Sequence, residues 1–176
     1  VLADGSLLAA CRTNRDSIVG REAQILEELV ARSVRIKAEF VVADEKEAGV
    51  RALLNLGHTV GHAIEATLLG TPNAMPHGIC VAIGVLAEVS WAHRRGACTR
   101  ETVDVFRETL TSLGIPVEPP KLDKELILRA SRFDKKARRG KLRTPIVEAI
   151  GQVKLIEIGI DETSELFHSL PGFRDA

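Results

Sequence analysis

The sequence has 176 residues, of which 45% are hydrophobic and 27% charged, and its 24 basic residues balance its 24 acidic ones. This length and composition predict one globular domain, and the zero net charge argues against nucleic acid or a membrane surface as a partner. No apolar run reaches the roughly 18–20 residues that a membrane span needs. Cys11, Cys80 and Cys98 form no C-x-x-C pair, so we expect free thiols and a cytoplasmic location.

The first part of the chain predicts two long helices. The chain begins at Val1 in an apolar run without Met, so we expect it to be part of a longer protein. Residues 4–20 are rich in turn and cap residues. Residues 21–42 carry apolar side chains at helical spacing and predict a helix, which a charged segment at 44–49 follows. A second helix is predicted over 50–69, ended by the turn residues at 70–73.

The second part predicts further helices and one β-hairpin. Residues 77–94 are apolar nearly all the way round, which indicates a buried helix. Residues 99–113 predict an amphipathic helix with Thr99 as its N-cap, and a short helix is expected near 124–132. Residues 145–147 and 153–160 flank Gly151-Gln152 and predict a small hairpin. The fold class is therefore mainly α, with a hairpin near the C-terminus.

The most informative segment lies in the predicted helix 50–69. At 100° per residue, five polar side chains fall within an arc of about 80°: Arg51, Asn55, His58, His62 and Glu65. Solvated helix faces are usually built from Lys, Glu, Gln and Arg, so the two histidines at i, i+4 favour a site. Taken alone, the H-x-x-x-H pair is equally consistent with a structural pair and with a metal or anion site. Gly57 and Gly61 indicate the close approach of another helix or a ligand.

Further residues are candidates for the same site because of the histidine pair in this predicted helix. His77 stands at the start of the buried helix 77–94, where capping is the commoner role, but beside His58 and His62 it becomes a plausible further ligand. Lys37 precedes the charged segment. The basic cluster around Lys135 and Lys136 fits a solvated loop and an anion site equally well.

Five motifs together resemble one enzyme family. They are Ser33–Ala38, Asp44–Arg51, Leu54–Glu65, His77–Gly84 and Asp134–Lys136. In this order, over about residues 30–150, they resemble 3-dehydroquinate synthase, a sugar-phosphate cyclase. The 2-deoxy-scyllo-inosose and valiolone-forming cyclases share the pattern, and group III metal-dependent alcohol dehydrogenases share a weaker version. The resemblance implies that residues 1–176 form the multihelical C-terminal domain, and that the Rossmann-like N-terminal domain is absent from this sequence.

The resemblance also implies roles for single residues. His58 and His77 would be ligands of zinc or cobalt, with a third ligand, a Glu, in a motif upstream of Val1. NAD would bind to the absent domain. The implied catalytic and substrate-binding side chains are Lys37, Glu47, Arg51, Asn55, His62, Lys135 and Lys136. His62, Asn55 and one of the two lysines would bind the substrate phosphate, whereas Lys37, Arg51 and Glu47 would lie on the carboxylate side.

The implied reaction belongs to the shikimate pathway of aromatic amino acid biosynthesis. NAD transiently oxidises a ring hydroxyl of a phosphorylated, carboxylated sugar, phosphate is eliminated, the ketone is reduced, the ring opens and an aldol step closes the carbocycle. The resemblance implies a homodimer, and we expect the 176 residues alone to be inactive. Ile79 replaces the usual Glu and Val85 the usual Met, which leaves the exact cyclase substrate open. The non-enzyme alternative is a zinc-binding or dimerisation module that has lost catalysis.

Overall fold

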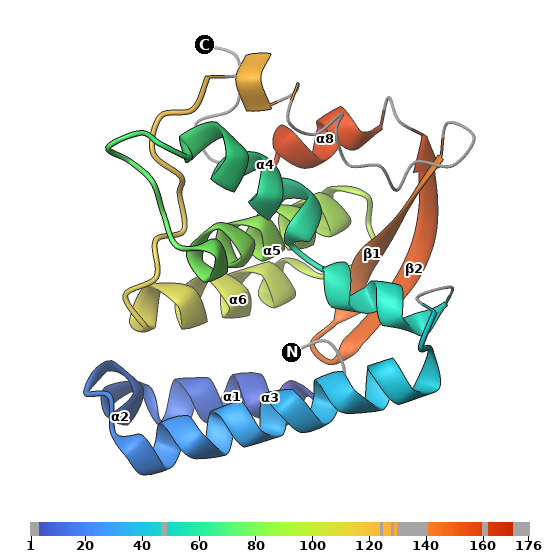
Figure 1. Cartoon of the computed structure of the whole chain (residues 1–176). Helices are drawn as coiled ribbons and strands as arrows, with labels where there is room; N and C mark the ends of the chain where they lie inside the picture. Colours follow the sequence, from blue (N-terminus) through green and yellow to red (C-terminus); the bar gives the residue numbers. More distant parts are fainter. Residues whose placement is uncertain are drawn as a thin grey trace.

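The structure, a computed structural model, describes residues 4–46, 49–123, 125–127, 129, 141–159 and 162–170. It is mainly helical, with one antiparallel hairpin along one side (Figure 1). The elements in chain order are α1 (Gly5–Thr13), α2 (Arg15–Val19), α3 (Ala23–Ala43), the 3-10 helix η1 (Val50–Asn55), α4 (His58–Leu68), α5 (His77–Arg94), α6 (Arg100–Ser112), β1 (Lys141–Ala149), β2 (Gln152–Gly159) and α8 (Thr163–Phe167). The predicted fold class is confirmed.

The amino-terminal segment is helical, so the prediction of turn material over residues 4–20 was wrong. Asp4 is the N-cap of α1, because its side chain accepts a hydrogen bond from the backbone amide of Ser6 at 2.8 Å. Asn14 ends the same helix, and its backbone amide donates to the carbonyl of Ala10. The polar residues of this segment therefore mark helix ends, which is where Asp and Asn are favoured.

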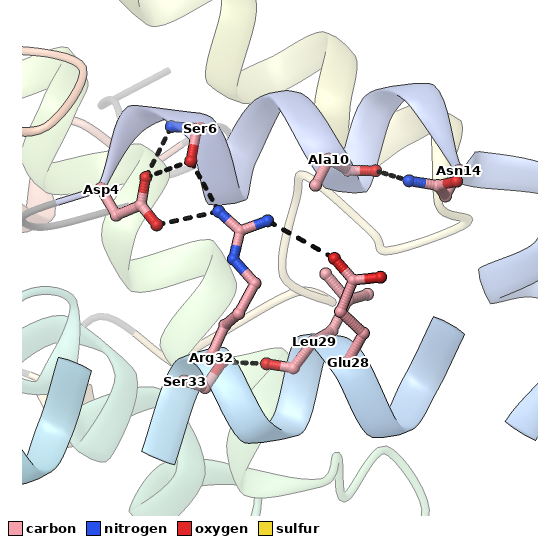
Figure 2. A network of polar contacts seen from close by, with 8 residues as sticks. All are labelled: Asp4, Ser6, Ala10, Asn14, Glu28, Leu29, Arg32 and Ser33. Atoms are coloured by element: carbon pink, nitrogen blue, oxygen red, sulfur yellow. Dashed lines mark hydrogen bonds and ion pairs between the residues drawn. The ribbon is translucent and has the colours of Figure 1, made fainter. Parts of the chain in front are cut away.

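Polar contacts join α1 to α3, which has no buried residue. Arg32 on α3 donates to the Asp4 carboxylate at 2.9 Å and to the Ser6 hydroxyl at 2.6 Å, and Glu28 lies 3.9 Å from the same guanidinium (Figure 2). The hydrogen bonds from Ser6 and Arg32 hold the pKa of Asp4 well below its ordinary value. This network therefore attaches the amino-terminal helices to one another through charge more than through apolar burial.

We expect Asp4→Ala to lower the thermal unfolding midpoint at pH 7, because it removes both the helix cap and one of the ion-pair partners of Arg32. The pKa of Asp4 is depressed in the folded state, so its contribution is fully present above the ordinary value of 3.8 and is lost as the pH falls. The difference between the two proteins should therefore shrink between pH 5 and pH 2, as circular dichroism melts can measure. Asp104→Ala, which breaks an exposed ion pair within α6, is the control; an equal loss there would contradict the proposed role.

The core of the molecule is centred on α5. Its buried side chains include Ile83, Leu86, Val89 and Trp91, all at most 2% exposed, as the apolar pattern of residues 77–94 predicts. Helix α4 packs on one side of α5, and α6, β1 and α8 contact it elsewhere (Figure 1). Among the described helices, none is both long and apolar enough to cross a membrane. Cys80 and Cys98 are buried free thiols, and Cys11 is also free, as predicted.

The predicted helix over residues 50–69 is broken in the middle. Its first part is η1, Leu56 is extended (φ −54°, ψ 127°), and Gly57 has a φ of 78° before α4 begins. Glycine is required there because the left-handed region is unfavourable for residues with a side chain. Arg51 and Asn55 therefore do not share an α-helix with His58, and the predicted five-residue polar face is not continuous.

The hairpin is longer than predicted. Strands β1 and β2 pair from Lys141 opposite Gly159 to Ala149 opposite Gln152, with an irregularity after Val147. Gly151 forms the turn with a φ of 80° and packs against Gly5 at the start of α1. In the predicted helix near 124–132, residues 125–127 and 129 are helical, and the other positions lie outside the described residues.

Candidate metal and substrate site

Three histidines from two helices converge on one point. His58 and His62 lie one turn apart on α4, and His77 is the first residue of α5. Their ring centroids are 5.2 Å apart for His58 and His62, and 5.5 Å apart for each of the other two pairs. One ring nitrogen from each lies within 4.8 Å of the others. The α4–α5 packing thus adds His77 to the i, i+4 pair that the sequence shows.

The hydrogen bonds of His58 and His77 orient their rings. The Nδ1 atom of His58 lies 3.2 Å from the carbonyl oxygen of Leu56, and that of His77 lies 2.9 Å from a carboxylate oxygen of Glu65. Both partners are acceptors, so each Nδ1 carries a proton and leaves Nε2 as the electron-pair donor in the neutral ring. A second ring nitrogen fixed by a carboxylate or carbonyl is the usual arrangement of metal-binding histidines.

The backbone around the cluster is electropositive. His58 begins α4 and His77 begins α5, so two helix amino termini meet here, and their dipoles favour anions. The amide of Gly78 lies in the first turn of α5, and nothing lies within 4 Å of the position that a side chain would occupy there. The amino terminus of α5 is therefore accessible to a small anion.

The three histidines fit a zinc or cobalt ion. Both metals accept imidazole nitrogen, and Zn–N bonds are about 2.0–2.1 Å, which places two nitrogens on one ion about 3–4 Å apart. The donor atoms lie within 4.8 Å of one another, and small side-chain rotations are enough to bring these distances to about 3–4 Å. His62 and His77 are exposed and His58 is half-buried, so a ligand can reach the cluster.

The other predicted site residues that the structure describes lie on the elements before α4. Lys37 is exposed on α3, at one end of a shallow groove of about 300 Å³ that also includes Val30 and Val34. Arg51 and Asn55 are half-buried on η1. The Arg51 guanidinium donates to the carbonyl of Glu45 at 2.8 Å. The structure brings the histidines together with one another, while these three residues occupy the neighbouring α3–η1 segment.

Three predicted residues cannot be placed in this way. Glu47, Lys135 and Lys136 lie outside the described residues.

Two acidic residues of the site were not assigned a role from the sequence. Glu65 lies three residues after His62, and this spacing already places it on the histidine face of α4. Glu88 lies in an otherwise apolar helix and is 1% exposed. Its carboxylate accepts a hydrogen bond from the backbone amide of Gly57 at 2.7 Å. Spacing alone gives no signal for Glu88, since its partner is 31 residues away.

Comparison with known proteins agrees with this architecture. A curated 3-dehydroquinate synthase from Synechocystis sp. is 40% identical over 166 residues, which are 92% of this chain and 45% of the relative. That of Syntrophotalea carbinolica is 38% identical over 146 residues, covering 83% of this chain and 40% of the relative. The chain thus spans less than half the length of these relatives.

Solved structures share the fold. A 2-epi-5-epi-valiolone synthase from Streptomyces hygroscopicus subsp. jinggangensis, with NAD+ and Zn2+ bound, superposes with a TM-score of 0.75 at 20% identity, over 96% of this chain and 47% of that one. A 2-deoxy-scyllo-inosose synthase complexed with carbaglucose-6-phosphate, NAD+ and Co2+ gives 0.69 at 21% identity, over 81% and 41%. The sequence model of the 3-dehydroquinate synthase C-terminal family matches residues 1–137. The chain therefore belongs to the 3-dehydroquinate synthase C-terminal family.

Proposed function

We propose that this chain is the metal- and substrate-binding half of a 3-dehydroquinate synthase, which converts 3-deoxy-D-arabino-heptulosonate 7-phosphate to 3-dehydroquinate and phosphate in the shikimate pathway. The observation that carries the proposal is the convergence of His58, His62 and His77 at two helix amino termini. Relatives at 38–40% identity that are 3-dehydroquinate synthases support it. The activity is that of the complete enzyme, in which NAD binds to the other half.

The two ring-oriented histidines are the proposed metal ligands. His58 and His77 would hold zinc or cobalt through Nε2, because the carbonyl of Leu56 and the carboxylate of Glu65 fix their Nδ1 atoms. Such an ion supplies Lewis acidity, polarising a substrate oxygen. Glu65 keeps the ring of His77 in place and adds negative charge behind a cationic centre.

The remaining proposed residues bind the anionic ends of the substrate. His62 faces the same point as the two metal ligands and would contact the phosphate together with Asn55 and one of Lys135 and Lys136. A phosphate there would also meet the positive ends of α4 and α5. Lys37, Arg51 and Glu47 would lie on the carboxylate side. Arg51 suits a carboxylate because its guanidinium offers a planar pair of donors.

A chimera tests this function. Residues 1–176 replace the matching half of the Synechocystis relative, so that an NAD-binding half of the same family is supplied, and product formation is followed with NAD and zinc. We expect phosphate and 3-dehydroquinate to form from the heptulosonate phosphate, and His58→Ala and His77→Ala to reduce kcat/KM by about 100-fold or more. The unmodified relative is the positive control.

The same chimera separates the alternatives. Turnover of glucose 6-phosphate in place of the heptulosonate would indicate a 2-deoxy-scyllo-inosose type of cyclase, and oxidation of a simple alcohol would indicate a group III dehydrogenase. A folded chimera that binds zinc and NAD but turns over none of these substrates would contradict an enzymatic role and favour a zinc-binding or dimerisation module. We expect the isolated 176 residues to show no turnover with added NAD, since they lack the redox half of the reaction.

A further inference from the structure

A buried carboxyl group connects the two helices that carry the histidines. Glu88 lies on α5, one turn after Gly84, and its side chain is 1% exposed. One carboxyl oxygen accepts the hydrogen bond from the amide of Gly57, and the other has no hydrogen-bond partner among the described residues. Burying a polar group costs free energy unless hydrogen bonds compensate, so a half-satisfied carboxyl group at this depth calls for an explanation.

The group that Glu88 binds is the beginning of α4. Gly57 is the N-cap residue of this helix and has no side chain with which to cap it. The first amides of a helix have no acceptor within the helix and need one from elsewhere. Glu88 supplies an acceptor from α5 to the amide of the N-cap residue itself, which is the amide that the Glu of a capping box binds. His58 follows Gly57 directly, and His62 lies one turn further on.

Helices α4 and α5 pack closely where Glu88 binds the amide of Gly57. A side-chain carbon on Gly84 would lie 2.1 Å from the carbonyl oxygen of Gly57, and one on Gly61 would lie 2.8 Å from the Cα atom of Val81. The two backbones therefore touch at the level of the α4 amino terminus. Glu88 accepts from the amide of Gly57, while the carbonyl of Gly57 accepts from the amide of Gly61 within α4 at 2.8 Å and lies close to Gly84.

We propose that Glu88 is a positioning residue of the metal centre, which fixes the start of α4 on α5 and so holds His58 and His62 in register with His77. This inference deepens the proposed function and rests on it for the identity of the bound metal. Glu88 touches neither substrate nor metal in this account. It acts through the backbone of Gly57, and its essential property is a hydrogen-bond acceptor at this depth in the core.

Two variants of matched size test the proposal on the full 176-residue chain. Glu88→Gln keeps an acceptor for the Gly57 amide, whereas Glu88→Met has nearly the same shape and keeps none. We expect Glu88→Met to weaken cobalt and zinc binding by about tenfold, the scale seen when an outer-shell partner is lost, and to change the visible absorption spectrum of bound cobalt. Glu88→Gln should bind within about threefold of the wild type. Val89→Ala, a neighbouring core truncation, controls for lost stability and should leave the cobalt spectrum unchanged.

A measurement without metal keeps this inference separate from the proposed function. Hydrogen exchange of the Gly57 amide, followed by NMR, should be slow in the wild type and in Glu88→Gln and at least about tenfold faster in Glu88→Met. If the wild type binds no metal, the proposed metal site fails while the exchange result still decides the role of Glu88. Equal protection of Gly57 in all three proteins, or equal metal affinity of Glu88→Met and Val89→Ala, would overturn the proposal.

Discussion

Gly84→Ala is expected to destabilise the protein by about 3 kcal/mol or more, at the upper end of the cost of overpacking a core. The added methyl group would lie 2.1 Å from the carbonyl oxygen of Gly57 and 2.8 Å from the amide nitrogen of Gly61. All these neighbours are backbone atoms, so no side-chain rotation relieves the clash and α5 must move away from α4. Urea unfolding followed by circular dichroism measures the loss, which corresponds to a fall of about 10 °C in the thermal midpoint.

Gly78→Ala provides the matched control on the same helix. Nothing lies within 4 Å of the carbon that it would add. Alanine is the better helix former, so this variant should be neutral or stabilised by up to about 1 kcal/mol. A Gly84→Ala protein within 1 kcal/mol of the wild type would show that α4 and α5 do not pack backbone to backbone, and the arrangement of the histidines would then need another explanation.

The second large effect concerns Glu88 and pH. Burial raises the pKa of Glu88 from its ordinary value of 4.5 to about 8, and the amides of Gly57 and Val60 offset this in part. Between these two pH values the unfolded chain binds fewer protons than the folded one at this group, so the free energy of unfolding falls as the pH rises. The full loss, reached above the folded pKa, is up to about 5 kcal/mol.

Glu88→Gln should remove this pH dependence, because the amide resembles the protonated acid at every pH. We therefore expect the stability difference between Glu88→Gln and the wild type to shift in favour of the variant from pH 5 to pH 9, as urea unfolding at several pH values can show. All other ionisable groups are common to both proteins, so the comparison isolates the contribution of Glu88. Glu108→Gln, which alters an exposed carboxylate on α6, should keep the wild-type slope. Equal slopes for Glu88→Gln and the wild type would contradict the burial of an ionisable group here.

The spacing of apolar residues along the sequence predicted the longer helices correctly. The helix 77–94 is buried because apolar residues surround it, and Thr99 caps the next helix as expected. The short helices α1 and α2 were missed because a five- or nine-residue helix has too few apolar positions to show a period, so only its caps are visible. The same residue types that initiate helices also form turns.

The sequence predicted the relative positions of site residues only where those residues lie in the same helix. His58 and His62 keep their i, i+4 relation because both lie within α4, whereas Arg51 and Asn55 lost theirs at the Gly57 break. A glycine inside a helical pattern is usually tolerated, so the pattern could not show that Gly57 has a positive φ. The position of His77 depends on α4 packing against α5, so the sequence could offer it only as a candidate ligand, a role that the family resemblance also implies. The partner of Glu88 is set by the same packing.

The central claim is that His58 and His77, with His62 beside them, form one metal site. A zinc titration of the 176-residue chain, read by calorimetry with competition by a chelator, tests it most directly. We predict one ion per chain, with binding lost in His58→Ala and in His77→Ala. His93→Ala should bind as the wild type does, since His93 is hydrogen-bonded to the carbonyl of Cys98 away from the cluster. No saturable binding by the wild type, or unchanged binding by the His58 and His77 variants, would contradict the account.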